Sequence, residues 1–405
     1  MISADKIKEI VKSQSVLFEG QGQWLKRETD IGSKLISGYV LVLTGVRRSG
    51  KSTLLKQFSE SVRPSLYLHF DDPRLVEFEV LDFYKIEEIY GMDSIYLFDE
   101  LSNIPEWEKY IRHLTERKGK AIVTGSNANL IGPEYGTLLT GRNLPQELFP
   151  LSYNEYLSLR NYAKGNDSFQ SYIKEGGFPE YLFHPNTEIL RQYLIDILNR
   201  DIIRRYSVVN TEDLNRLTMY LMNNIARLYS IQNIKKALDV KSVNTLSTYI
   251  TYLEDVYLLF SVPIYDLSYK RQLINNKKIY AIDTAMVNSV TVKVNQDIGR
   301  LFENTIFLHL RRYIREIFYY KKEFECDFVV RCPNQEFQCY QVCYQLNDDN
   351  LKRELNGLVE ALEFFKLEEG TLISFAQTDY FVINNKKINV IPAYEWCTLN
   401  PIVNK

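Results

Sequence analysis

The strongest constraint on the fold of this chain is an eight-residue segment between an apolar stretch and a helical pattern. Residues 45–52 read Gly-Val-Arg-Arg-Ser-Gly-Lys-Ser and match the pattern G-x-x-x-x-G-K-[ST]. Glycines at these positions let the backbone curl so that N–H groups surround an anion, and a following helix aims its positive end at the same point. Tyr39–Thr44 is typical of a buried strand, and Lys51–Glu60 favours a helix. This context favours a phosphate-binding loop over a glycine-rich surface turn.

The residues of this loop supply different chemistry to a nucleotide. Lys51 can place its charge on the β- and γ-phosphates, and the Ser52 hydroxyl can be a ligand of Mg²⁺. The side chains of Arg47 and Arg48 can meet phosphate or a neighbouring domain, or can be solvated. The expected ATP-binding set is Gly45, Val46, Arg47, Arg48, Ser49, Gly50, Lys51, Ser52 and Thr53.

A second candidate element is a buried strand that ends in two acids. Residues 95–100 read Ile-Tyr-Leu-Phe-Asp-Glu. Asp99 is expected to hold the Mg²⁺ shell, and Glu100 to polarise the attacking water; the alternative is a strand end with solvated acids. A further predicted strand, Ser65–Phe70, separates the loop from Asp99 along the chain. With the glutamate beside the aspartate, this favours an ATPase with a catalytic glutamate over a GTPase.

Two weaker features follow. Residues 124–127, Thr-Gly-Ser-Asn, end the next predicted strand, where a polar side chain can sense the γ-phosphate or the water, or can form a simple turn. Arg142, in the sequence Thr140-Gly141-Arg142, precedes the last predicted strand. It is a candidate arginine finger, acting in cis or from a second copy in a homo-oligomer, because arginine stabilises charge that develops on a transferred phosphoryl group.

The order of patterns along the chain predicts an α/β core followed by two further domains. Strands are expected at Tyr39–Thr44, Ser65–Phe70, Ser94–Phe98, Lys120–Thr124 and Leu144–Phe149. Helices such as Trp107–Arg117 lie between them, and this alternation is typical of a parallel sheet covered on both faces. We predict an α/β P-loop core at 1–150, a helical and winged-helix segment at 151–285, and a nuclease-like domain at 286–405.

The predicted winged helix rests on two helices, a turn and a hairpin. Ser230 can cap a helix at Ile231–Leu238, and a second helix follows a turn at Asp239–Ser242. Leu258–Ile264 and Lys278–Ile282 would form the hairpin. The second helix has one apolar face: Leu246, Tyr249, Ile250, Leu253, Val256 and Tyr257.

In the last third, the order helix, three strands, helix, strand is that of a restriction-endonuclease-like α+β fold. The helices are expected at about Gly299–Tyr313 and Asn350–Phe365. The strands are expected at Ile317–Tyr320, Glu325–Arg331, Glu336–Tyr344 and Thr371–Phe375.

Composition excludes several classes of protein. The chain has 405 residues, 45% of them hydrophobic and 25% charged, which is typical of a globular protein of several domains. Its formal net charge of −2 argues against a chain that coats nucleic acid without specificity. No apolar run approaches the roughly 20 residues that a membrane span needs. The polar N-terminus and the five cysteines fit a reduced, cytoplasmic protein.

With these motifs in order, the chain resembles the prokaryotic AAA-type ATPases whose C-terminal half is known only as a domain of unknown function. The stretches that carry the resemblance are Leu43–Ser52, Phe98–Glu100, Thr124–Ser126, Thr140–Arg142, Leu148–Ser152, Gly176–Glu180, Arg200–Ile202, Gly299–Asn304 and Cys326–Val330. The resemblance implies an AAA-like ATPase core, a winged-helix segment and a C-terminal nuclease-like domain. For some archaeal and bacterial relatives, an action on DNA or in defence against mobile elements is suspected.

Two interpretations of function stay open: an ATP-driven enzyme that acts on DNA, and a nucleotide-dependent switch that rearranges a protein partner. The second helix carries side chains that can face a groove: Asn244, Thr245, Ser247, Thr248 and Thr251. The nearby cations on the helices are Lys235, Lys236 and Lys241, whereas Glu254 and Asp255 are acidic.

Nuclease chemistry is not expected. Glu303 and Asp327 match the helix acid and the strand acid that the family nucleases use, but Gln341-Val342-Cys343 stands where they have E-x-K. An amide oxygen is a weaker ligand for a hard cation than a carboxylate, and a thiol cannot replace the lysine charge. We expect Glu303 and Asp327 to be structural acids that pair with Arg300 or a nearby lysine.

Overall fold

The computed structural model describes residues 1–16, 25–131, 139, 141–291 and 297–401, and the chain divides into two compact units. The first unit comprises Met1–Phe149 together with Asp255–Tyr257. The second comprises Pro150–Glu254 and Leu258–Lys405. The division into three domains stays a prediction.

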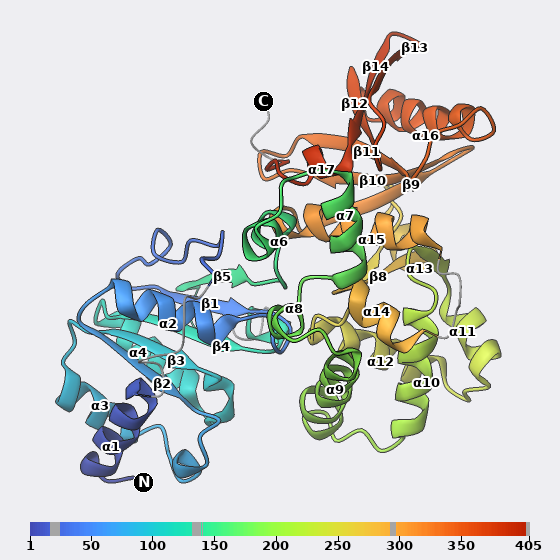
Figure 1. Ribbon diagram of the computed structural model, residues 1–405. Coiled ribbons are helices and arrows are strands. Elements are labelled where there is room, and N and C mark those ends of the chain that lie inside the picture. The colour runs from blue at the N-terminus through green and yellow to red at the C-terminus, as the bar shows by residue number, and fades with distance from the viewer. Residues whose placement is uncertain (17–24, 132–138, 140, 292–296, 402–405) are drawn as a thin grey trace. The chain divides into compact units, whose positions relative to one another are not determined.

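The first unit is built on a parallel sheet with the strand order β2-β3-β4-β1-β5 (Figure 1). Its strands are β1 (Val40–Thr44), β2 (Ser65–His69), β3 (Ile95–Asp99), β4 (Lys120–Gly125) and β5 (Asn143–Glu147). Every residue of β1 and β3 is buried, which explains their continuous apolar runs. The predicted parallel sheet is confirmed, with shifts of one or two residues at the strand ends.

Helices cover both faces of this sheet. On one face, α1 (Ala4–Val16), α3 (Asp82–Tyr90) and α4 (Trp107–Glu116) share a core with the strands. On the other face, α2 (Lys51–Ser61) packs through Leu54 and Leu55. Short 3₁₀ turns complete the unit at Pro73–Leu75, Leu101–Asn103 and Ala128–Ile131. The sequence analysis predicted α2 and α4 at nearly these residues, but it named no helix at the positions of α1 or α3.

The second unit begins with helices, as expected from the loss of strand–helix alternation. They are α6 (Tyr153–Arg160), α7 (Asn166–Glu175), α8 (Pro179–Phe183), α9 (Thr187–Asp196), a π-helical segment (Ile197–Arg204) and α10 (Thr211–Met222). The break at Gly176 and Gly177 has a tertiary cause. Gly176 has φ 64°, and a Cβ atom there would lie 2.3 Å from a carboxylate oxygen of Asp283, which accepts the Gly177 N–H at 2.6 Å.

A small antiparallel sheet follows, with the strand order β6-β8-β7. Its elements are β6 (Arg227–Tyr229), α11 (Ile231–Leu238), α12 (Val243–Asp255), β7 (Leu259–Val262), α13 (Tyr269–Ile274) and β8 (Lys277–Ala281). The predicted helix pair and hairpin are present, whereas β6 and α13 were not predicted. One detail was wrong: α12 ends at Asp255, and Tyr257 has φ 61°, so Val256 and Tyr257 do not continue its apolar face.

The C-terminal part of this unit is a mixed six-stranded sheet with the order β13-β14-β12-β11-β10-β9. Its strands are β9 (Glu316–Lys321), β10 (Glu325–Arg331), β11 (Phe337–Cys343), β12 (Glu369–Ser374), β13 (Asp379–Ile383) and β14 (Lys386–Pro392). The helices are α14 (Thr284–Val290), α15 (Ile298–Tyr313), α16 (Leu351–Phe364) and α17 (Ala393–Trp396), and α16 packs on one face of the sheet (Figure 1). The predicted order of elements is present, and the hairpin β13–β14 adds to it. In the described part of the chain, no helix has both the length and the apolar character required of a membrane span.

Candidate active site

The carboxyl ends of three neighbouring strands in the first unit bring the predicted motifs to one edge of the sheet. β4 lies between β1 and β3, with Thr44 paired to Gly125 and Phe98 paired to Val123. The loop after β1, the acids at the end of β3 and the polar residues at the end of β4 are therefore adjacent. Such an edge is where open α/β sheets bind ligands.

Two glycines shape the loop that follows β1. Gly45 has φ 151°, and a Cβ atom there would lie 2.1 Å from the carbonyl oxygen of Leu148. The N–H of Leu148 donates to the Thr44 carbonyl at 2.7 Å, which holds the two segments close. Gly50 has φ 98° and directly precedes α2. These positions require glycine, because a side chain would collide at Gly45 and would be strained at Gly50.

Lys51 points its charge into the loop. Its side chain is 5% exposed, and Nζ donates to the carbonyl oxygens of Gly45 at 2.9 Å and Val46 at 3.1 Å. The buried Ser49 Oγ has no hydrogen-bond partner among the described residues. A buried ammonium and an unused hydroxyl inside a curled loop fit an anionic ligand. Of the other predicted residues, Val46 is buried, Arg47, Ser52 and Thr53 are partly exposed, and Arg48 is exposed in a left-handed conformation.

Thr124 on β4 contacts both acids at the end of the neighbouring strand β3. Its hydroxyl donates to Oδ1 of Asp99 and accepts the backbone N–H of Glu100 at 2.9 Å. Asp99 and Thr124 are fully buried, and Glu100 has φ 54°, which turns the chain out of the strand directly after Asp99. The side chain of Thr124 therefore orients both acids, a role that the sequence did not predict for it.

A tyrosine on β2 connects the two predicted magnesium ligands. The Tyr67 hydroxyl donates to Asp99 Oδ2 at 2.6 Å and also forms a side-chain hydrogen bond with Ser52. Burial raises the pKa of Tyr67 far above its usual range, and the charges of Asp99 and Glu100 raise it further. The Tyr67 hydroxyl thus contacts both predicted magnesium ligands, Ser52 and Asp99, and lies within the field of the Glu100 charge.

Two more side chains of this site were missed by sequence reasoning. His69 lies two residues after Tyr67 on β2, and its Nδ1 is 3.4 Å from Asp99 Oδ2. Arg27 is 9% exposed and donates to the carbonyl oxygens of Ser49 at 2.8 Å and Phe149 at 2.7 Å, so it braces the loop. The alternation of Tyr67 and His69 along a strand was a usable signal, because both side chains must share one face. No local pattern marks Arg27.

Arg142 is not brought to the loop within one chain. Its carbonyl accepts the N–H of Val40, and it directly precedes β5, whose first residue pairs with the first residue of β1. Gly45 follows the last residue of β1, so the length of a five-residue strand, about 16 Å, separates the two backbone positions. The Arg142 side chain is exposed. Thr140 of the same motif lies outside the described residues.

In the second unit, the predicted structural acids do lie together. Glu303 and Asp327 both contact Lys278 of β8. The sequence predicted that these acids pair with Arg300 or with a nearby lysine. The structure shows the pairing with a lysine, and Arg300 pairs with Asp297 instead. Gln341 contacts the backbone of Asp327.

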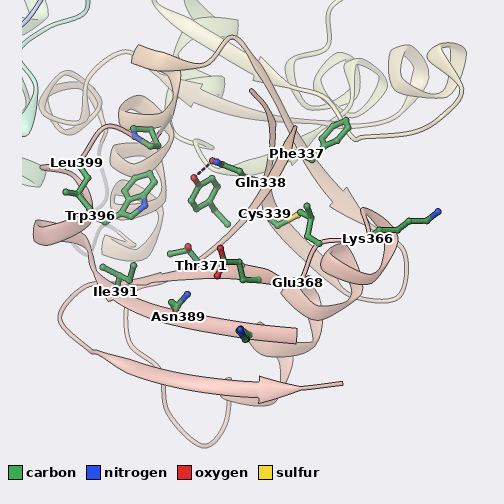
Figure 2. Close-up of a pocket in the computed structure, with 16 residues that line it drawn as sticks. Phe337, Gln338, Cys339, Lys366, Glu368, Thr371, Asn389, Ile391, Trp396 and Leu399 are labelled. Atoms are coloured by element: carbon green, nitrogen blue, oxygen red, sulfur yellow. Dashed lines mark hydrogen bonds between the residues drawn. The ribbon is translucent and has the colours of Figure 1, made fainter. Parts of the chain in front are cut away.

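A cavity of about 500 Å³ lies on the face of the C-terminal sheet opposite α16 (Figure 2). Its wall includes Tyr340, Thr371, Asn389 and Trp396. The charged residues of its lining are Lys366, Lys387, Glu368 and Glu369. Because charges of both signs balance, this cavity favours no particular class of ligand.

Comparisons with known proteins agree with the order of the two halves. Residues 37–157 match the family described as AAA domain, and residues 166–297 match Domain of unknown function (DUF8612). The chain is 32% identical over 407 residues to the uncharacterized protein MJ1544 of Methanocaldococcus jannaschii, covering 91% of this chain and 90% of the relative. It is 28% identical over 381 residues to an uncharacterized protein of Haemophilus influenzae, covering 85% of this chain and 93% of the relative.

Among solved structures, the replication initiator DnaA bound to AMPPCP and single-stranded DNA aligns with 61% of this chain and 87% of its own, at 15% identity and a TM-score of 0.28. The relative from Methanocaldococcus jannaschii aligns over nearly the whole length of both chains. The chain therefore belongs to the same family as MJ1544, and it carries an AAA domain followed by a domain of unknown function.

Proposed function

We propose that this protein is an ATPase that binds ATP–Mg²⁺ through residues 45–53 and hydrolyses the γ-phosphate. The observation that carries the proposal is the pair of hydrogen bonds through which Thr124 orients both Asp99 and Glu100, next to a loop that holds a buried lysine charge. A structural turn with solvated acids would not bury Asp99 completely and fix it through two other strands.

The loop residues bind and orient the nucleotide. Lys51 exchanges its two carbonyl partners for oxygens of the β- and γ-phosphates, and the N–H groups at the start of α2 complete the anion site. Bound Mg²⁺, held by Ser52 and Asp99, would neutralise charge that develops on the phosphate oxygens.

Glu100 handles the proton of the attacking water. The water oxygen forms a bond to the γ-phosphorus while the bond to the β–γ bridging oxygen breaks, and ADP leaves with that oxygen. The Glu100 carboxylate accepts the proton that the water loses. Thr124 holds the Glu100 backbone and so determines where the carboxylate can reach.

Arg142 would act on the nucleotide of a second copy of the chain. Its place at the amino end of β5, one strand length from its own loop, does not favour action in cis. A homo-oligomer would supply the arginine from a neighbour.

The second unit would respond to the nucleotide state, and DNA is one candidate for what it contacts. Four polar residues of α12 are exposed: Asn244, Ser247, Thr248 and Thr251. Exposed cations of the preceding helix and turn are Lys236 and Lys241. A polar helix face beside cations is what a winged helix needs to contact a groove and its phosphates. The alternative is a nucleotide-dependent switch for a protein partner, with no role for nucleic acid.

Two substitutions test the ATPase proposal. Lys51→Ala should lose most nucleotide affinity, whereas Glu100→Gln should retain affinity and lose turnover, because an amide cannot accept the proton. The measurements are binding of a fluorescent ATP analogue and release of phosphate. Lys34→Ala, which removes an exposed lysine of the same unit, is the matched control. Unchanged turnover in Glu100→Gln would remove the role given to that residue.

A fluorescence anisotropy titration separates the two partner hypotheses. With labelled DNA at low salt, wild-type protein should bind with and without ATP, and Lys236→Ala/Lys241→Ala should bind more weakly and with a smaller salt slope. Absence of binding at low salt would eliminate DNA and leave the protein switch.

A further inference from the structure

A buried ion cluster in the second unit lies outside the residues proposed for ATP hydrolysis. Nζ of Lys278 is 2.7 Å from Asp327 Oδ1, 2.9 Å from Glu325 Oε1 and 3.2 Å from Glu303 Oε1. The lysine is only 3% exposed. One ammonium therefore occupies the point at which three carboxylates converge.

The members of this cluster come from three elements. Glu325 and Asp327 are two residues apart on β10 and so share one face, and Glu303 comes from α15. Lys278 and Tyr280 likewise share a face of β8, and the Tyr280 hydroxyl donates to Glu303 Oε1 at 2.7 Å. The hairpin strand β8 thus inserts both a cation and a hydroxyl donor among the acids of the nuclease-like sheet.

The charge of Lys278 is retained in this buried position. Burial lowers the pKa of Lys278, but the charges of Asp327, Glu303 and Glu325 outweigh burial and raise it well above its usual range. Burial raises the pKa of Glu303, and the ammonium opposes this. Three acids against one lysine leave the cluster with more negative than positive charge when all are ionised.

The other groups around Asp327 are already engaged within the protein. Asp327 Oδ2 accepts the N–H of Val342 at 3.0 Å. The side-chain oxygen of Gln341 accepts the N–H of Asp327 at 3.2 Å, and its amide donates to Glu354 at 2.6 Å. Gln341 is therefore used to orient the backbone and a helix acid, so it does not replace the missing carboxylate as a metal ligand.

We propose that Lys278 is a built-in cation that takes the place of a divalent metal between Glu303, Glu325 and Asp327. Its ammonium keeps metal ions out of the cluster and holds β8 against β10. This goes beyond the proposed ATPase, because it assigns a role to a site with no nucleotide and explains how a nuclease-like arrangement of acids is stable without metal chemistry.

The proposal has a consequence for metal binding. Without the ammonium, three buried or partly buried carboxylates would repel one another, and a hard divalent cation, which prefers carboxylate oxygens, would relieve the repulsion. Lys278→Met keeps the length and the apolar stem of the side chain but removes its charge. This variant should gain a divalent-cation site that the wild-type protein lacks.

The experiment uses the full chain without nucleotide and Mn²⁺ as the probe, followed by electron paramagnetic resonance and calorimetry. Lys278→Met should bind about one Mn²⁺ more per chain than wild type, and Lys278→Met/Asp327→Asn should lose the added site. Lys321→Met is the matched control, since Lys321 also contacts Glu325, at 3.2 Å, but is exposed and should not create a site when removed.

Two results would overturn the proposal. One is Mn²⁺ binding by wild type that Asp327→Asn abolishes, because the ammonium would then not exclude metal. The other is a folded Lys278→Met protein with no added Mn²⁺ site. If Lys278→Met does not fold, the proposal requires that Mn²⁺ restore its folding and that Lys278→Met/Glu303→Gln/Asp327→Asn fold without metal; failure of either requirement rejects it.

Discussion

Thr124→Val is the substitution that most directly tests how the strand ends orient the two acids proposed for ATP hydrolysis, Asp99 and Glu100. Valine has nearly the shape of threonine, so the sheet should keep its packing. The substitution removes the hydroxyl that donates to Asp99 and accepts from the backbone of Glu100. Both acids then lose a partner that is buried between the strands.

The size of the effect follows from these two hydrogen bonds. A bond to a charged group contributes about 1.5–3 kcal/mol, and a buried N–H without a partner costs about 1–3 kcal/mol. Glu100 is only partly buried, so water can reach its backbone and reduce the second cost. A destabilisation of about 3 kcal/mol follows, which in a unit of this size lowers the melting temperature by roughly 6–12 °C.

Turnover should fall more than affinity. Release of the Glu100 backbone misplaces its carboxylate and raises the activation free energy of hydrolysis. An increase of about 1.4–2.8 kcal/mol lowers kcat by about 10–100-fold. Nucleotide affinity should change by less than about threefold, because Lys51 and the loop backbone are untouched. The assays are phosphate release at saturating ATP, binding of an ATP analogue, and thermal unfolding.

Two control variants make the result interpretable. Thr124→Ser keeps the hydroxyl and should recover most of the turnover. Thr115→Val removes another buried hydroxyl of the same unit, whose bond to the Arg112 carbonyl is local to α4, and should leave kcat unchanged. A folded Thr124→Val protein with wild-type kcat, or one whose affinity falls as much as its turnover, would refute the orienting role.

Four further outcomes are expected. Gly45→Ala should abolish nucleotide binding, measured with the ATP analogue, because its Cβ would meet the Leu148 carbonyl at 2.1 Å. If Arg142 acts in trans, ATPase activity should rise more than linearly with protein concentration, and wild type should partly rescue Arg142→Ala; strict proportionality would leave a cis or structural role. Burial raises the pKa of Asp283 to about 6, above its value in the unfolded chain. The contribution of protonated Asp283 to the free energy of unfolding is therefore complete below about pH 4 and is lost as the pH rises through 6. The loss is up to about 3 kcal/mol and should be absent from Asp283→Asn in unfolding measured against pH. Incubation with single- and double-stranded DNA and RNA in Mg²⁺ or Mn²⁺ should give no cleavage, and cleavage that disappears in Asp327→Ala would contradict this.

Local patterns in the sequence were sufficient to predict the elements around the phosphate loop. The glycines, the lysine and the serine at residues 45–52 stand between a strand and a helix, and the structure has that strand, loop and helix in order. The helix pair before β7 was also predicted, because the spacing of Leu246, Tyr249, Ile250 and Leu253 allows only one helix face to be buried. Such signals lie within one element and need no knowledge of its neighbours.

The limits of sequence reasoning appear where two distant segments meet. The sequence correctly placed the strand at Ser65–Phe70 between the loop and Asp99 along the chain, but it did not predict the order of strands in the sheet. There β2 is an edge strand, and β4 lies between β1 and β3. Strand order depends on backbone pairing across the chain, which residue periodicity does not encode. This pairing places the Thr124 hydroxyl within hydrogen-bond distance of Asp99 and of the Glu100 backbone. It also places Tyr67 and His69 next to Asp99.

The sequence by itself determined the chemical types at the phosphate loop, the paired acids and the loss of the E-x-K pattern, because these are fixed by residue identity and spacing. Only the tertiary structure decided that Arg142 lies a strand length from its own loop, and that the ammonium of Lys278 lies among Glu303, Glu325 and Asp327. An ammonium can neutralise carboxylates from any element that brings it within about 3 Å, and distance in space is not written in the spacing along the chain.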